Sequence, residues 1–164
     1  MLATSGLRLG EVSTLAKSDI EFDSRRVVPH NAHQTNVTKR ALYSFFNSEC
    51  ESVLTQYLQS RKDSSPHLFI PLQLNGYSQE NGYLDRSSIQ TVFRQASEKS
   101  GVKLTPQSLR DFFCEEMSER GLPERYVDFF CGRTPKSVLA RHYSDYKPEK
   151  MRARYEKIGL TALS

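Results

Sequence analysis

Apolar side chains recur along the chain with two different periods, and the shorter period predicts strands. Three short β-favouring runs lie at residues 20–22, 26–28 and 41–46. They are separated by Asp23-Ser24 and by the polar stretch 30–38, which are typical of turns and loops. The pattern predicts a small antiparallel three-stranded sheet, with Lys39 at the start of the third strand.

The longer period is that of helices. After a predicted loop at residues 4–6, a short helix is expected from Arg8 to Leu15. Two apolar stripes follow, formed by Val53, Leu54, Tyr57 and Leu58 and by Ile89, Val92, Phe93 and Ala96. Residues 64–83 hold two prolines and two glycines, which predicts a long loop around a short extended piece at 67–70.

Prolines mark the helix starts in the last sixty residues or so, because a missing N–H costs nothing in a first helical turn. Pro106, Pro123, Pro135 and Pro148 predict helices over 105–120, 123–131, 135–144 and 148–158. Glycines at 101, 121 and 132 stand where helix ends need a left-handed residue. The fold class is therefore α+β, mostly helical with a small sheet.

Composition adds limits rather than identity. A chain of 164 residues with 37% apolar and 26% charged residues fits one soluble domain. It has no apolar run of about 18 residues and no signal-peptide pattern at its start, so we expect a cytoplasmic protein. Cys50, Cys114 and Cys131 are odd in number and far apart, which favours buried reduced thiols. The net charge of +4 is compatible with a polyanionic partner.

Candidate chemistry begins at the helix that Pro106 opens. Gln107 and Arg110 are three residues apart and so neighbours at its N-terminal end, where free N–H groups and the helix dipole favour an anion. A lone arginine there is usually a surface side chain. Arg110 belongs to one of four motifs, however, and together these motifs indicate a functional role for it.

The four motifs together resemble the tyrosine recombinase (integrase) family. The first, ATSGLRLGEV at 3–12, is similar to the first arginine box of that family, with Arg8 and Glu11 at the family positions. VTKR at 37–40 resembles the hairpin segment that carries the family's lysine, here Lys39. LTPQSLR at 104–110 resembles the second box, and CGRTPKSVLARHY at 131–143 the third box and the nucleophile, Tyr143. The last segment looks most like integrases of archaeal viruses, plasmids and integrated elements.

The resemblance implies metal-independent DNA cleavage and rejoining, without a cofactor. Tyr143 would attack a DNA phosphodiester, form a 3′-phosphotyrosyl link and release a 5′-hydroxyl, which Lys39 would protonate. Arg8 and Arg110 would bind the non-bridging oxygens, since guanidinium groups match that geometry. The remaining expected roles are support by Glu11 and His142 and DNA contacts by Arg40, Lys136 and Arg141.

Two positions depart from the usual family pattern. Gln107 replaces the histidine of the second box, and Arg133 replaces the histidine or tryptophan of the third. Neither side chain accepts a proton near neutral pH, so we expect both to donate hydrogen bonds to the phosphate. His142 diverges from Tyr143 by about 100° on a helix, which disfavours it as the base. Tyr146 is the rival nucleophile, with a packed aromatic as the simpler interpretation.

The expected partner is double-stranded DNA at attachment sites. The resemblance implies a homotetramer on DNA, with exchanged C-terminal segments, and a monomer or weak dimer without it. We interpret residues 1–164 as the catalytic domain, without the N-terminal core-binding domain of the family. The alternatives are a catalytically impaired DNA-binding fragment, a type IB topoisomerase-like strand transferase and an unrelated helical regulator.

Overall fold

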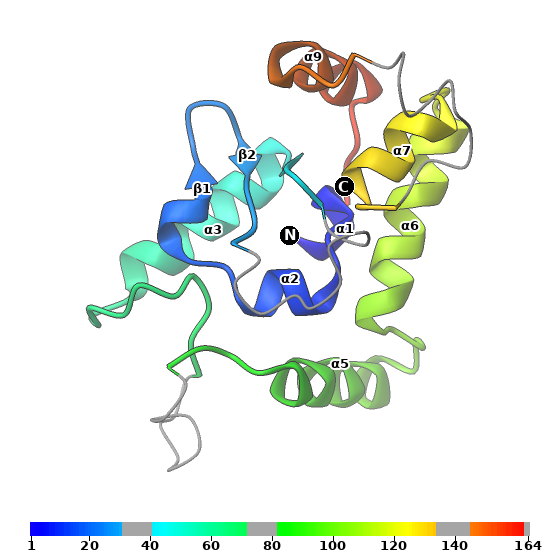
Figure 1. Ribbon diagram of the computed structural model, residues 1–164. Coiled ribbons are helices and arrows are strands. Elements are labelled where there is room, and N and C mark those ends of the chain that lie inside the picture. Colours follow the sequence, from blue (N-terminus) through cyan, green and yellow to red (C-terminus); the bar gives the residue numbers. More distant parts are fainter. Residues whose placement is uncertain (31–40, 72–81, 134–144, 163–164) are drawn as a thin grey trace.

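The computed structural model describes residues 1–30, 41–71, 82–133 and 145–162 (Figure 1). Short elements dominate the first half and longer helices the second. The elements in chain order are α1 (Leu2–Ser5), α2 (Leu9–Ser13), a 3-10 turn (Lys17–Asp19), β1 (Ile20–Glu21), β2 (Arg26–Val27), β3 (Ser44–Phe45), α3 (Ser48–Ser60), α5 (Arg86–Ser100), α6 (Pro106–Glu119), α7 (Glu124–Phe130) and α9 (Pro148–Ile158). The predicted fold class, mostly helical with a small sheet, is confirmed.

The sheet has the predicted topology but shorter strands. Its order is β1-β2-β3, antiparallel throughout, with Ile20 opposite Val27 and Arg26 opposite Phe45. The third strand covers Ser44–Phe45 rather than 41–46. The predicted start of that strand at Lys39 lies outside the described residues. The predicted extended piece at 67–70 is reduced to a single bridge between Ala16 and His67.

The prolines do open helices as the sequence predicts. α6 begins at Pro106 and α9 at Pro148, and Pro123 directly precedes α7. Thr105 caps α6 because its hydroxyl accepts from the Ser108 N–H at 3.0 Å. The helix predicted over 135–144 lies outside the described part of the chain.

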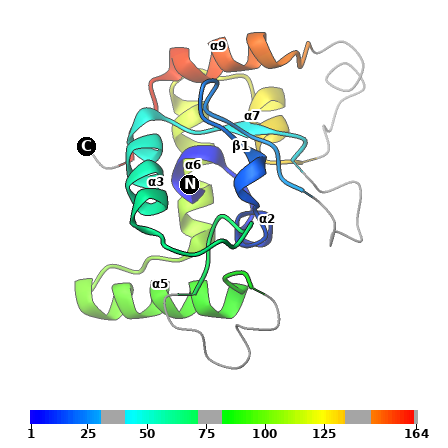
Figure 2. The same ribbon diagram turned by 90° about the vertical axis from the view of Figure 1, so that its left-hand side faces the viewer.

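Two predictions from local pattern were wrong. Residues 4–6 do not form a loop, since α1 includes Thr4 and Ser5, whose hydroxyls donate to the Met1 carbonyl. The apolar stripes on α3 and α5 are narrower than expected, because Val53, Val92 and Ala96 are exposed. α5 and α9 lie at opposite ends of the molecule in Figures 1 and 2. α5 contacts α2 and α6.

The core has two clusters that differ in chemistry. The first, here called the aliphatic cluster, consists mainly of Leu2, Leu7, Val12, Leu15, Ile20, Val27, Ala41, Phe46, Cys50, Leu54 and Leu68. The second, here called the aromatic cluster, consists of Phe45, Phe113, Met117, Leu122, Tyr126, Val127, Phe130, Cys131, Met151, Tyr155 and Leu160. Among the described residues, no helix combines the length and apolarity needed to cross a membrane.

Candidate active site

Arg8 is delivered by a tight turn between the first two helices. α1 ends at Gly6, whose φ of +65° is left-handed and disfavours a side chain. A Cβ at Gly6 would also lie only 2.4 Å from Cδ1 of Phe113. The turn can therefore sit directly on α6, which brings Arg8, at the start of α2, beside the second predicted arginine box.

Glu11 fixes the backbone around Arg8. Its carboxylate is buried and accepts the Arg8 backbone N–H at 2.7 Å, and it lies 3.5 Å from Nη1 of Arg8. The other oxygen accepts the Ala41 N–H at 2.9 Å. Glu11 thus ties the Arg8 turn to the chain two residues beyond Lys39.

Arg110 is a buried structural centre rather than a surface arginine. It is 5% exposed, and its two terminal nitrogens donate to the carbonyls of Gly6 at 2.5 Å and of Cys131 at 2.6 Å. These bonds join α6 to the Arg8 turn and to the end of α7. Because both acceptors are backbone atoms, the bonds depend on how those three segments pack.

Arg133 follows α7, and its side chain is partly exposed. Gly132, with φ of +56°, ends the helix, and the Arg133 N–H donates to the Asp128 carbonyl at 2.8 Å. Nη1 of Arg133 is 3.6 Å from the Asp128 carboxylate, and the side chain is 44% exposed. The Gly132 carbonyl accepts from Nη2 of Arg8 at 2.9 Å, so the same turn contacts Arg8 and orients Arg133.

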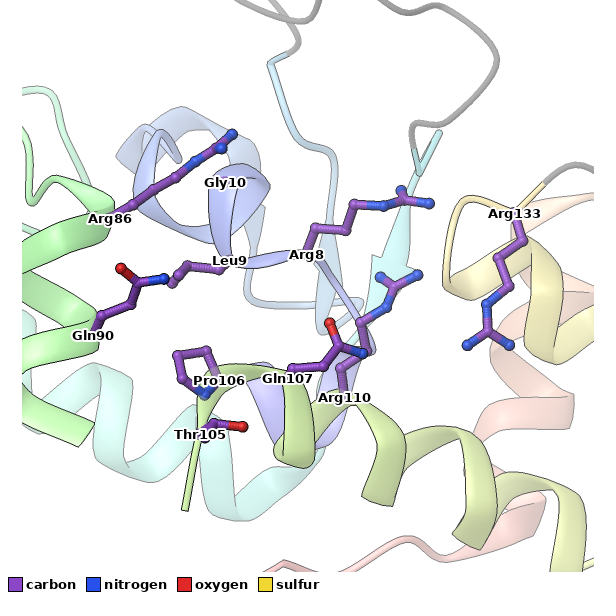
Figure 3. Close-up of a pocket in the computed structure, with 10 residues that line it drawn as sticks. All are labelled: Arg8, Leu9, Gly10, Arg86, Gln90, Thr105, Pro106, Gln107, Arg110 and Arg133. Carbon is purple, nitrogen blue, oxygen red and sulfur yellow. The ribbon is translucent and has the colours of Figure 1, made fainter. Parts of the chain in front are cut away.

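One cavity of about 730 Å³ brings these side chains together (Figure 3). Its lining comes from the Arg8 turn, α5, the start of α6 and the end of α7: Arg8, Leu9, Gly10, Arg86, Gln90, Thr105, Pro106, Gln107, Arg110 and Arg133. Figure 3 shows Arg8 and Arg110 turned toward the side of the cavity where Arg133 lies. The predicted grouping of Arg8, Gln107, Arg110 and Arg133 is therefore present.

The cavity concentrates positive charge. Burial lowers the pKa of Arg8, and the neighbouring charge of Arg110 lowers it further, with a smaller effect from Arg133, while Glu11 opposes these effects. Nη1 of Arg8 is also buried without a hydrogen bond to any described residue. An anion in the cavity would relieve the repulsion among the arginines, and a phosphate matches their donors.

Gln107 lies on the exposed side of α6, at the mouth of the cavity. Its amide donates to the Asp111 carboxylate at 2.8 Å, one helical turn later. That bond holds the side chain along the helix surface. It leaves one N–H of the amide for another acceptor, as the prediction of a phosphate donor requires.

Arg86 and Gln90 were missed by sequence reasoning. Both come from α5 and line the end of the cavity away from Arg133 (Figure 3). The Arg86 guanidinium packs so closely on Gly10 that a Cβ there would lie 2.0 Å from its Nη2. Neither residue belongs to a motif, and only their position at the start of a predicted helix offered a signal.

Several predicted residues lie outside the described residues: Lys39, Arg40, Lys136, Arg141, His142 and Tyr143. The rival nucleophile, Tyr146, is described. Its ring stacks on Phe129 with centroids 4.6 Å apart, and its carbonyl accepts the Tyr43 hydroxyl. This packing favours the interpretation of Tyr146 as a packed aromatic. The described residues contain no group of three or more metal-ligating side chains placed to hold an ion.

Comparisons with known proteins point to one protein family. A model of the phage integrase family matches residues 1–150. The chain is 26% identical over 139 residues to tyrosine recombinase XerA of Pyrococcus horikoshii, and 25% identical over 127 residues to XerA of Pyrococcus furiosus. Each alignment covers 77% of this chain and 42% of the relative, so the chain spans less than half the length of these relatives.

Solved structures share the fold. The crystal structure of XerA recombinase superposes with a TM-score of 0.66 at 23% identity, covering 94% of this chain and 55% of that one. The Tn1549 transposon integrase, in complex with circular intermediate DNA, gives 0.65 at 18% identity, covering 96% and 57%. The integrase of mycobacterium phage Brujita gives 0.65 at 17%, covering 96% and 48%. Since the family model matches most of its length, the chain belongs to the phage integrase family of tyrosine recombinases.

Proposed function

We propose that residues 1–164 are the catalytic domain of a site-specific DNA recombinase that cleaves and rejoins DNA through a phosphotyrosyl link at Tyr143. One observation carries the proposal: Arg8, Arg110 and Arg133, from three separate segments, line one cavity. A cavity with three guanidinium groups suits the phosphoryl transition state, whose non-bridging oxygens gather negative charge.

The three arginines differ in what they offer the phosphate. Arg110 already donates to two carbonyls, so its fork is oriented in advance by the fold. One terminal nitrogen of Arg8 donates to Gly132, and the other lies 3.5 Å from the Glu11 carboxylate but makes no hydrogen bond to a described residue. Arg133 is 44% exposed and makes one long ion pair with Asp128 at 3.6 Å, which it can exchange for a contact with DNA. We assign Arg8 and Arg110 to the non-bridging oxygens, and Arg133 and Gln107 to further hydrogen bonds.

The proposed roles of Lys39 and Tyr143 are supported by contacts of residues close to them in the chain. Ala41, two residues after Lys39, donates to Glu11, which in turn pairs with Arg8. Tyr146, three residues after Tyr143, stacks on Phe129 of α7, the helix that Arg133 follows. These contacts support Lys39 as the general acid and Tyr143 as the nucleophile. With glutamine and arginine at the usual histidine positions, we propose that the phenolic proton leaves to water or to a phosphate oxygen.

Duplex DNA is the proposed partner, and the protein would act where that DNA is, inside the cell. The Tn1549 integrase, which shares the fold, has been seen with DNA. We assign Arg40, Lys136 and Arg141 to phosphate contacts and His142 to a supporting role, and we propose a homotetramer on DNA. We further propose an origin in an archaeal virus, plasmid or integrated element. The archaeal XerA relatives support the archaeal part, and the residues before Tyr143 support the mobile element.

The test is covalent capture on a pool of nicked duplexes of randomised sequence, which trap the protein once the short cleaved strand diffuses away. Wild type should form an adduct that survives denaturation, and sequencing the trapped DNA would reveal the target. Tyr143→Phe should form none, whereas the matched variant Tyr146→Phe should keep the adduct. An adduct in Tyr143→Phe would exclude the proposed nucleophile.

The alternatives give different results in the same preparation. DNA binding without any wild-type adduct would support a catalytically impaired DNA-binding fragment. Relaxation of supercoiled plasmid without joining of two sites would support a topoisomerase-like activity.

A further inference from the structure

Two thiols lie together near Arg110, which donates to the Cys131 carbonyl, and they take no part in the proposed cleavage. Cys114 is on α6, and Cys131 directly follows α7. Their sulfur atoms are 3.1 Å apart, and both are free thiols. We propose that Cys114 and Cys131 form a reversible thiol–disulfide site, oxidised by small-molecule disulfides, and that its oxidation slows DNA cleavage. The effect on cleavage rests on the proposed function, whereas the thiol chemistry does not.

The two thiols differ in their access to a reactant. Cys114 is partly exposed, while Cys131 is fully buried. The Cys131 sulfur lies against the Arg8 turn, since a Cβ at Gly6 would come within 3.1 Å of it. A reactant from solution therefore meets Cys114 first, and Cys131 stands behind it as the second thiol.

Charge and hydrogen bonding also favour Cys114 as the thiol that reacts first. The hydrogen bond from Cys131 lowers the pKa of the Cys114 thiol, and the charges of Arg133 and Arg110 act in the same direction, against the opposing effect of burial. The pKa of Cys131 is raised by the same hydrogen bond and by burial. Thiolate, not thiol, is the nucleophile in exchange, so Cys114 is the residue that attacks.

The reaction balances as two successive exchanges with one small-molecule disulfide. The Cys114 thiolate attacks one sulfur of the reactant, forming a mixed disulfide and expelling one thiolate. Cys131 then transfers its proton to the thiolate expelled in the first exchange, and its sulfur attacks Sγ of Cys114, expelling the second thiolate. Overall, two protein thiols are oxidised to a disulfide and one reactant disulfide is reduced to two thiols.

Disulfide formation would affect the cavity because the carbonyls of Cys131 and Gly132 orient two of its arginines. A disulfide bond is about 2.05 Å long, so the sulfur atoms must approach by about 1 Å. The Cys131 carbonyl accepts from Arg110 and the Gly132 carbonyl from Arg8. A shift of this segment therefore moves the acceptors that orient both arginines. Misplacement of catalytic groups by about 1 Å typically slows a reaction on the order of a hundredfold, and we expect roughly a tenfold to hundredfold loss.

The experiment equilibrates the purified chain with graded ratios of oxidised to reduced glutathione. Free thiols are then alkylated and counted by mass spectrometry, and cleavage is followed on the captured target DNA. Oxidised wild type should lose two alkylation sites, yield a peptide pair linked through Cys114 and Cys131, and cleave at least tenfold more slowly until dithiothreitol restores the rate. The matched variant Cys50→Ser alters the third thiol, on α3, and should behave as wild type.

Cys114→Ser separates the outcomes, because it removes the attacking thiol and leaves every backbone acceptor in place. It should form no internal disulfide and should keep its reduced rate at every glutathione ratio, and Cys114→Ala serves the same purpose if serine disturbs folding. No internal disulfide in wild type at any ratio would overturn the site. A disulfide that forms without slowing cleavage would overturn its effect on activity. Reduced wild type that binds DNA but forms no adduct would overturn the proposed function. In that case the number of alkylated thiols would still show whether Cys114 and Cys131 form a disulfide.

Discussion

The aliphatic and aromatic clusters of the core are built differently. The aliphatic cluster gathers residues between Leu2 and Leu68, close to one another in sequence. The aromatic cluster joins Phe45 to residues 113–160, and its rings meet mostly edge to face, as Phe113 and Phe130 do at 6.3 Å. Arg8 follows Leu7 of the aliphatic cluster, whereas Arg110 and Arg133 are close in sequence to Phe113 and Cys131 of the aromatic cluster. The geometry of the candidate active site therefore depends on the contacts that connect the two clusters.

Hydrogen bonds to the carbonyls of residues 4–6 connect the two clusters, and these bonds are here called the joint. The carbonyls of Thr4, Ser5 and Gly6 accept from Tyr155 at 2.5 Å, from Ser44 at 2.6 Å and from Arg110 at 2.5 Å, respectively. Leu2 and Leu7, on either side of this turn, belong to the aliphatic cluster. A short helix of four residues thus connects both clusters, which predicts that they unfold together.

The largest expected effect comes from removing a ring at the centre of the aromatic cluster. Phe130 is fully buried and contacts the rings of Phe45, Phe113 and Tyr155. Phe130→Ala should lower the free energy of unfolding by about 3–5 kcal/mol, since it loses buried area and leaves a cavity. Urea unfolding followed by circular dichroism measures the change.

Leu15→Ala in the aliphatic cluster is the matched test, with an expected loss of about 2–4 kcal/mol. Both variants should unfold in a single transition, because the joint couples the clusters. Two separate transitions in either variant would show that the clusters are independent units.

The next effect contrasts the arginine in the joint with the partly exposed arginine. Arg110→Met leaves two buried carbonyls without their donor and should reduce stability by about 2 kcal/mol. Arg133→Met removes a half-exposed side chain and one long ion pair, so its loss should stay near 0.5 kcal/mol or less. Both should reduce adduct formation roughly a hundredfold or more at a temperature where both are folded.

The comparison fails if the two variants lose similar stability. Equal thermal midpoints would mean that the carbonyl bonds of Arg110 do not hold the segments together. Loss of stability without loss of cleavage in Arg110→Met would assign that residue a structural role alone.

Local rules account for much of what the sequence could predict. Pro106 and Pro148 identified helix starts because proline fixes φ and lacks the N–H that a first turn does not use. The short β-favouring runs in residues 20–46 identified the sheet, although its strands are only two residues long. The arginine set was predicted by resemblance, and the cavity brings its described members together.

What the sequence could not give depends on contacts between distant residues. A four-residue helix at Leu2–Ser5 is too short for a periodic signal. The burial of Arg110 follows from carbonyls 104 and 21 residues away. Likewise, 17 residues separate the two sulfur atoms of Cys114 and Cys131, and only the packing of α6 against α7 brings them together.

A smaller effect on stability than that of Arg110→Met is expected from the loss of one hydrogen bond of the joint. Tyr155 is buried in the aromatic cluster and donates to the Thr4 carbonyl at 2.5 Å. Tyr155→Phe keeps the ring and removes the donor, so it should cost about 1 kcal/mol at neutral pH. Unchanged stability would mean that the aromatic packing alone holds α9 against the first turn.

The same hydroxyl gives the joint a dependence on alkaline pH. Burial raises the pKa of Tyr155 above the value near 10 of an unfolded tyrosine. The stabilisation is fully present below about pH 10 and is lost as the pH rises further, because the unfolded chain releases a proton that the folded chain retains. Burial also raises the pKa of Tyr43 to about 12, so wild type loses two such tyrosine contributions above pH 10 and Tyr155→Phe only one, while the contribution of Cys131 is common to both proteins. Urea unfolding at successive pH values should show a fall with pH that is shallower in Tyr155→Phe by up to about 1.4 kcal/mol per pH unit. Parallel curves for the two proteins would show that the Tyr155 hydroxyl titrates as it does in the unfolded chain, and that the contact with Thr4 does not bind its proton.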